Sequence, residues 1–180
     1  MSDSDDLRSV QAPLKQRYRD DPDAAVVTLS ASGSLGDGVT CSVRTGHALA
    51  VAGLHPATGG DGTALCSGDM LLEALAACAG VTMRAVATAL EIAVEGRVTA
   101  EGDLDFRGTL GVDRDAPVGF QAIRVRFDLD TEADAARVAK LIELTERYCV
   151  VLQTLASPTA LSVGWDRSGA PLRDGPSGSA

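Results

Sequence analysis

A twenty-residue stretch, LLEALAACAGVTMRAVATAL, most constrains what this chain can fold into. It is nearly as apolar as a membrane span, but Glu73 and Arg84 lie within it, and each charge would cost about 2.5–3.5 kcal/mol at the centre of a bilayer. The run also lies between segments with strand periodicity, so we predict a buried central helix. A helix that is apolar on nearly all faces must be covered on nearly all faces. One small sheet covers only one side, which favours a homodimer.

Apolar and polar residues alternate on both sides of this helix. Residues 24–53 contain alternating runs joined by the turns GSLGDG and TGH, which predicts a three-stranded antiparallel meander. Residues 98–106 and 120–130 alternate in the same way. TEAD, from Thr131, is a capping-box variant that predicts a second long helix ending at Pro158, and ALSVGW predicts a last strand. The order βββ-α-ββ-α-β is that of an α+β domain with a largely antiparallel sheet.

Length and charge restrict the domain count and the partners. The 180 residues suffice for one ordinary domain, which we place at 24–166, between an N-terminal arm with a short helix (1–23) and a flexible tail (167–180). Lys and Arg number 16 against 25 Asp and Glu, and the net charge of −9 disfavours nucleic acid and anionic membranes as partners. The acidic opening residues carry no apolar signal segment, which predicts a cytoplasmic protein.

Four cysteines are the candidates for chemistry: Cys41, Cys66, Cys78 and Cys149. They form no CxxC pair, which argues against a disulfide framework in a reducing compartment. The two histidines, His47 and His55, are not spaced as ligand pairs with any cysteine, so we expect no bound metal. We expect His55 to belong to a surface loop near the apolar helix.

Spacing does not choose among these thiols. Cys78 lies in the apolar helix, where a buried cysteine is most often a small hydrophobic residue and where an apolar shell raises the thiol pKa. A reactive Cys78 would therefore need a cation, and three arginines are candidates: Arg44, Arg84 and Arg147. Cys66 is a rival nucleophile, because a helix N-terminus lowers a thiol pKa. Cys41 alternates in phase with the apolar residues of the predicted meander, so we expect it to be a core residue. Cys149, like Cys66 and Cys78, remains a candidate reactive thiol.

Two motifs resemble the OsmC/Ohr family of osmotically inducible and organic hydroperoxide resistance proteins. SGDMLLEALAACAGVTM is similar to the PxELLxAAxAAC segment of that family's central helix, and ERYCVV, some seventy residues later, is similar to its CPV turn. The similarity extends from about Ala24 to Trp165 and includes the order of elements. It implies an OsmC-like fold, an intertwined homodimer in which two sheets wrap around two central helices, with active sites near the subunit interface.

The same resemblance implies a two-cysteine thiol peroxidase for oxidative-stress defence. Cys78 would be the peroxidatic thiolate that attacks an organic hydroperoxide or hydrogen peroxide, and Cys149 would resolve the sulfenic acid as a disulfide. No bound cofactor is implied, because an external dithiol of the lipoyl or thioredoxin type would regenerate both thiols.

This sequence departs from the family pattern at three places. The family's hairpin Arg has no counterpart in GSLGDG, the Glu position holds Gly68, and Val150 stands where the CPV turn has proline. We therefore expect three other residues to support the thiolate: Arg44, Asp69 and Glu73. Asp69 is also a candidate helix N-cap. The alternative function is a non-catalytic OsmC-like protein that binds a small apolar or thiol ligand in the dimer-interface pocket.

Overall fold

The structure of the chain is a computed structural model that describes residues 5, 9, 11, 12, 16, 20, 32–35, 40–45, 48–111, 113–165 and 173–174. Most of the predicted N-terminal arm and tail lies outside these residues, and so does the histidine at position 47. The elements follow the order β1 (Ser32–Leu35), β2 (Thr40–Thr45), β3 (Ala48–Gly53), η2 (Pro56–Thr58), β4 (Leu65–Cys66), α2 (Ser67–Ala89), β5 (Glu95–Leu104), α3 (Phe106–Thr109), β6 (Phe120–Asp130), α4 (Ala135–Tyr148), α5 (Val150–Ala156), β7 (Gly164–Trp165) and β8 (Arg173–Asp174).

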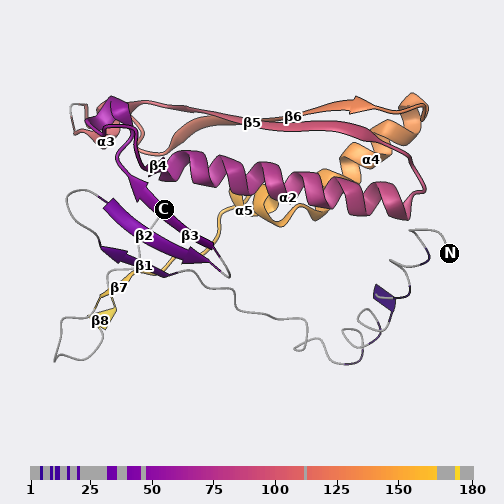
Figure 1. The fold of residues 1–180 in the computed structure, drawn as a ribbon, viewed down its shortest axis with the longest axis horizontal. Helices are drawn as coiled ribbons and strands as arrows, with labels where there is room; N and C mark the ends of the chain where they lie inside the picture. Colours follow the sequence, from indigo (N-terminus) through magenta and orange to yellow (C-terminus); the bar gives the residue numbers. More distant parts are fainter. Residues whose placement is uncertain are drawn as a thin grey trace.

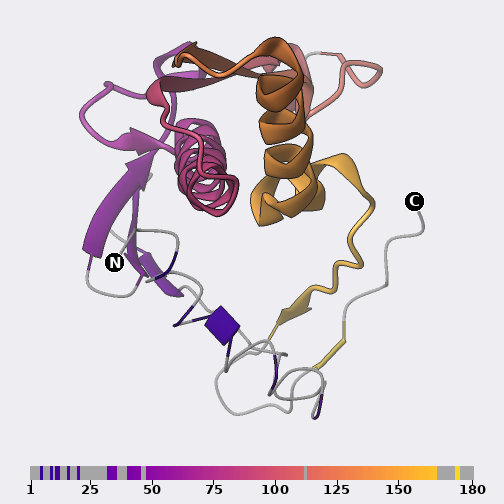
Figure 2. The ribbon, with the colours of Figure 1, turned by 90° about the vertical axis from the view of Figure 1, so that its right-hand side faces the viewer.

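The apolar helix α2 lies along the long antiparallel hairpin β5–β6 (Figure 1). Helix α4 runs beside α2 under the same hairpin, as the end-on view in Figure 2 shows. The buried residues of α2 recur every four positions and form one stripe: Leu75, Ala79, Met83 and Ala87. Met83 and Ala87 of this stripe pack with Leu141 of α4, which is 0% exposed. Leu75 and Ala79 pack with Cys149, and inner side chains of the hairpin contact both clusters. The core of the domain is the layer between hairpin and helices.

The rest of α2 is largely uncovered in the single chain. The helix is long and apolar enough to cross a membrane by length and composition, yet only 28% of its most apolar window is buried. Val81, about 160° around the helix from the buried Ala79, is 72% exposed. The predicted central helix is therefore present, but a single copy of the chain covers only one of its faces.

The predicted meander is present as β1–β2–β3, with antiparallel register. It lies beside the N-terminal end of α2 and apart from the long hairpin (Figure 1). Strand β4, just before α2, adds to it in parallel with β3. The described strands thus form separate small sheets, largely antiparallel, in a mixed helix and strand fold that agrees with the predicted class.

The second predicted helix differs from expectation at its start and in its middle, whereas its end at Ala156, just before Pro158, agrees with the prediction. The N-cap of α4 is Asp134, whose carboxylate accepts from the Arg137 amide at 2.9 Å, rather than Thr131. The Thr131 hydroxyl instead donates to the Ala93 carbonyl at 2.6 Å and ties the segment before α4 to the loop between α2 and β5. Cys149 has an extended backbone (φ −73°, ψ 106°) that separates α4 from α5. The predicted last strand shortens to β7, which pairs with β8 in the tail segment.

Candidate functional site

The two cysteines singled out by the family resemblance lie together in the fold. Cys78 is near the middle of α2, and Cys149 is the residue at which α4 ends and α5 begins. Both belong to one core cluster with Leu75, Ala79 and the inner side chains of the hairpin. Residues seventy-one positions apart in the sequence therefore share one apolar environment, because α2 packs against the junction of the two later helices.

Four hydrogen-bond donors surround the Cys78 sulfur. They are the backbone amides of Val151 and Val150, the Cys149 thiol and the Thr82 hydroxyl. Burial raises the pKa of Cys78, because an apolar surround disfavours the charged thiolate. The four donors outweigh burial, and the pKa of Cys78 lies below that of an ordinary cysteine. Neutral dipoles can thus hold Cys78 as a thiolate.

Cys149 has the opposite character. Its side chain is 0% exposed, and burial raises its pKa. The amides of Leu152 and Val151 act against burial, whereas the neighbouring Cys78 raises the pKa of Cys149 further, because two negative sulfurs repel each other. The two shifts are opposite in direction, so Cys78 ionises before Cys149 as pH rises. This asymmetry is what a nucleophile and a resolving thiol require.

The predicted supporting carboxylates lie away from the Cys78 sulfur. Asp69 is the third residue of α2 rather than its N-cap, which is Cys66, so the N-cap prediction is wrong. Nine residues of helix place Asp69 about 14 Å from Cys78 along the axis and on the opposite face. Glu73 is exposed and about 140° around the helix from Cys78. A single copy of the chain does not bring either carboxylate to the thiol.

In the part of the chain that the structure describes, no charged side chain acts on Cys78, so none of the described arginines supplies the expected cation. Arg84 donates to the Val94 carbonyl at 2.6 Å and lies 3.4 Å from Glu95, at the far end of α2. Arg147 lies over the ring of Tyr148 at 5.6 Å. Arg44 is paired with Leu49 in the meander, but its side chain lies outside the described residues, and its role stays a prediction.

The rival thiol occupies a different place. Cys66 precedes α2 and lines a cavity of about 360 Å³ with Asp69 and His55. The His55 ring stacks on Phe106 at 5.0 Å, and its Nδ1 accepts from the Ala57 amide, so the loop position expected for His55 is present with a structural role. Cys66 is about 18 Å from Cys78 along the helix. The Cys41 backbone is in β2, and its side chain is not among those described.

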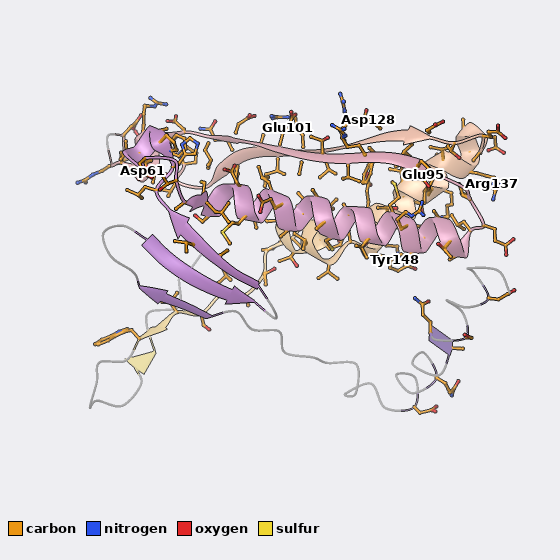
Figure 3. All side chains as sticks on the ribbon, in the orientation of Figure 1. Asp61, Glu95, Glu101, Asp128, Arg137 and Tyr148 are labelled. Carbon is orange, nitrogen blue, oxygen red and sulfur yellow. The ribbon has the colours of Figure 1, made fainter. Side chains whose placement is uncertain are left out.

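Other charged groups and metal-type ligands lie outside this site. Glu101 and Asp128 project from the face of the hairpin that points away from α2 (Figure 3). A second hollow, of about 780 Å³, lies at the end of α2 between Arg84 and Arg137. Arg137 is engaged there with the carbonyls of Leu90 and Glu91. The described residues contain no group of three His, Cys, Asp or Glu side chains arranged to hold a metal ion.

Three donors of the site were not assigned from the sequence. Thr82 shares a helix face with Cys78, but only the packed structure shows where its hydroxyl points. Val150 and Val151 contribute through their backbone, so their side chains give no signal. One sequence feature does bear on this: Val150 stands where proline would have no amide to donate.

Comparisons with known proteins agree with this fold. The family model for OsmC-like proteins matches residues 60–164, more than half of the chain. An OsmC-like protein from Mycoplasma pneumoniae has a similar structure, with a TM-score of 0.61 at 16% identity over 72% of this chain and 88% of that one. A hypothetical protein from Aquifex aeolicus gives 0.57 at 16% identity over 73% and 89%. An OsmC-like protein of unknown function from Vibrio cholerae gives 0.54 at 11% identity over 72% and 94%.

A search of curated proteins found no match to the sequence. At 11–16% identity, the similarity to these solved structures shows a shared fold. With the family match over residues 60–164, these findings place the chain in the family of OsmC-like proteins.

Proposed function

We propose that this protein is a thiol peroxidase that reduces organic hydroperoxides, and also hydrogen peroxide, with Cys78 as nucleophile and Cys149 as resolving thiol. One observation carries the proposal: Cys78 packs against the buried Cys149 in one core cluster, where the Cys149 thiol and nearby amides lower the pKa of Cys78. A thiolate is the reactive form of cysteine, and the resolving thiol is already in contact. The two-cysteine motif of the family supports the same assignment.

The chemistry balances with these two thiols and one external dithiol. The Cys78 thiolate attacks the terminal oxygen of the peroxide, the O–O bond breaks, and the alkoxide leaves with the electron pair and takes a proton from water. Cys78 is then a sulfenic acid. The Cys149 sulfur attacks it, a disulfide forms and water leaves. A dithiol reductant, of the lipoyl or thioredoxin type, returns both thiols by exchange and is itself oxidised to a disulfide.

The surroundings of Cys78 favour an apolar substrate and a second copy of the chain. Large apolar side chains near the site are exposed in the single copy, notably Val81 (72%) and Val150 (71%). Exposed large apolar side chains close to a buried site are typical of an interface. We propose that a second copy covers it in a cytoplasmic homodimer and leaves a pocket for the organic part of a hydroperoxide above Cys78.

A peroxide challenge of the reduced protein tests the function. Wild type, Cys78→Ser and Cys149→Ser would each be treated with cumene hydroperoxide and, separately, with hydrogen peroxide, and the products mapped by mass spectrometry. We expect wild type to lose two thiols and form a Cys78–Cys149 disulfide, Cys149→Ser to stop at the sulfenic acid, and Cys78→Ser to be inert. If Cys78 stays reduced at doses that oxidise free cysteine, the peroxidase assignment is wrong. The alternative, a protein that binds a small apolar or thiol ligand, would then be tested.

A further inference from the structure

The cavity beside Cys66 is not used by the chemistry proposed for Cys78. It lies between the start of α2, the loop at His55 and the end of the hairpin β5–β6, and its volume is about 360 Å³. Small-molecule sites have volumes of about 300–1,000 Å³, so this cavity has room for a ligand of one ring. Cys66 is about 18 Å from Cys78 along α2, which makes the cavity a separate site.

Two glycines make room for the aromatic wall of this cavity. The Phe120 ring lies against the backbone of Gly102, where a Cβ atom would come within 2.5 Å of the ring atoms Cδ1 and Cε1. At Gly68, a Cβ atom would lie 3.5 Å from Phe120 Cζ and 3.6 Å from the Cys66 sulfur. A side chain at either position would therefore occupy space between groups that line the cavity.

A second pair of rings in the lining is held in place by local contacts. The His55 ring stacks on Phe106, with centroids 5.0 Å apart and planes inclined by 16°. His55 Nδ1 accepts from the Ala57 amide at 3.0 Å, and the His55 carbonyl accepts from the Thr58 amide at 2.8 Å. Because ring and backbone are both fixed, a ligand would bind without ordering this part of the wall, and this lowers the entropic cost of binding.

The charged groups of the lining are carboxylates. Asp69 and Asp103 line the cavity, and no Lys or Arg is among the described residues around it. Asp103 is paired with Arg124, whose guanidinium donates to it at 2.9 Å. Within the described part of the chain, Asp69 has no hydrogen bond or ion pair to another side chain. A cation here would be attracted by Asp69 and by the ring faces, whereas an anion would be repelled.

We propose that this cavity binds a small organic cation with a single aromatic ring. The ring packs against Phe120, and the positive charge lies beside Asp69. This function goes beyond the peroxidase reaction and does not depend on it. The site is also compatible with the proposed dimer. Leu72, which lines the cavity, lies about 180° around α2 from Val81, so a second copy seated on Val81 covers a different face.

The test uses benzyltrimethylammonium, which has one ring, a permanent positive charge and no group that reacts with thiol reagents. Iodoacetamide labelling of Cys66 in the reduced protein would be timed by peptide mass spectrometry, with Cys78 as the reference in the same sample. For a Kd on the order of 1 mM, about 10 mM probe should slow labelling of Cys66 about tenfold and leave Cys78 unchanged. Neutral benzyl alcohol and anionic phenylacetate should slow it less than about twofold.

Two variants separate the shape of the cavity from its charge. Gly68→Ala adds a methyl group in contact with the Cys66 sulfur, at a helical position where alanine is the better helix former. Asp69→Asn removes the charge at nearly constant shape. We expect the probe to slow labelling of Cys66 less than about threefold in each variant. The matched control is Gly80→Ala on the same helix, where the added methyl group meets Val98 at 3.7 Å, and it should keep the full protection.

Three results would overturn the proposal. The first is an unprotected Cys66 in wild type, and the second is equal protection by the neutral or anionic compound. The third is protection that neither Gly68→Ala nor Asp69→Asn reduces, or that extends equally to Cys78. The measurement requires no peroxide, so its outcome is independent of the peroxidase function, whose failure would appear as Cys78 that cumene hydroperoxide leaves reduced.

Discussion

Replacing Val150 with proline removes one hydrogen-bond donor from the Cys78 thiolate and leaves the rest of the site in place. Val150 is the first residue of α5, where the backbone amide has no carbonyl partner within the helix and donates to Cys78 instead. Proline is well tolerated at a first helical position. The preceding Cys149 already has the extended conformation that a residue before proline prefers. The Val150 side chain is 71% exposed, so its loss costs little packing.

The expected size of the effect follows from two opposing factors. A hydrogen bond to a charged group contributes about 1.5–3 kcal/mol, and the lower end applies here because several donors share one partly exposed sulfur. About 1.4 kcal/mol corresponds to tenfold less thiolate below the thiol pKa. A more basic thiolate is also the better nucleophile, by about threefold for this change. Val150→Pro should therefore label Cys78 about threefold more slowly at pH 6 and about threefold faster at pH 10.

The labelling rates of wild type and Val150→Pro are expected to cross as pH rises, and the experiment looks for that crossing. Iodoacetamide labelling of the Cys78 peptide would be timed across the pH range for wild type, Val150→Pro and Val150→Ala. The alanine variant keeps the amide and tests the side chain, and we expect it to follow wild type within about twofold. If Val150→Pro is slower at every pH, access to the sulfur has changed rather than its basicity. If it matches wild type throughout, the amide does not stabilise the thiolate, and the reasoning is refuted.

The remaining predictions concern the thiol pair, the core and the uncovered helix face. At pH 7 the label should enter Cys78 well before Cys149, because the thiolate fraction rises with pH through a lowered pKa for the first and a raised pKa for the second. Cys149→Ala should slow labelling of Cys78 at pH 6 by about threefold through loss of the thiol donor, and Cys149→Ser, which keeps a donor, should slow it less. Leu141→Ala should lower the free energy of unfolding by about 2–5 kcal/mol in a urea titration, because its side chain is 0% exposed between α2 and α4. Val81→Asp should convert the expected dimer to monomer in sedimentation velocity with little loss of helix content, and an unchanged sedimentation coefficient would place the dimer interface elsewhere.

Periodicity predicted most of the fold because it reports burial along each element. The alternation of residues 120–130 was sufficient for β6, and the apolar run around Cys78 was sufficient for α2. Features set by contacts between elements were missed. Thr131 has the residue type of a cap, but its hydroxyl is used by the Ala93 carbonyl, and Asp134 caps α4 instead. No Gly or Pro marks the break at Cys149, so the sequence predicted one continuous helix through this position.

The candidate site, like the fold, was predictable from the sequence only in part. The pairing of Cys78 with Cys149 was predictable only from the family resemblance, which implies one cysteine on the central helix and a second that resolves it. The groups that lower the pKa of Cys78 were not predictable in this way, because a reactive Cys78 was expected to need a cation. Sequence shows charged side chains, whereas the donors here are backbone amides, a thiol and a hydroxyl. The role of such groups can be recognised only in the folded structure, where packing places them around one atom.

The break at Cys149 connects these observations. A continuous helix through that position would pair the amides of Val150 and Val151 with carbonyls of the preceding turn, as the Cys149 amide is paired with Thr145. Ending α4 there frees both amides at the place where α2 presents Cys78, and it places the second thiol beside the first. Proline at 150 would favour the same break but would remove one of the freed donors. In a chain whose first hairpin turn lacks arginine, valine at this position adds an amide to the thiolate's neutral donors.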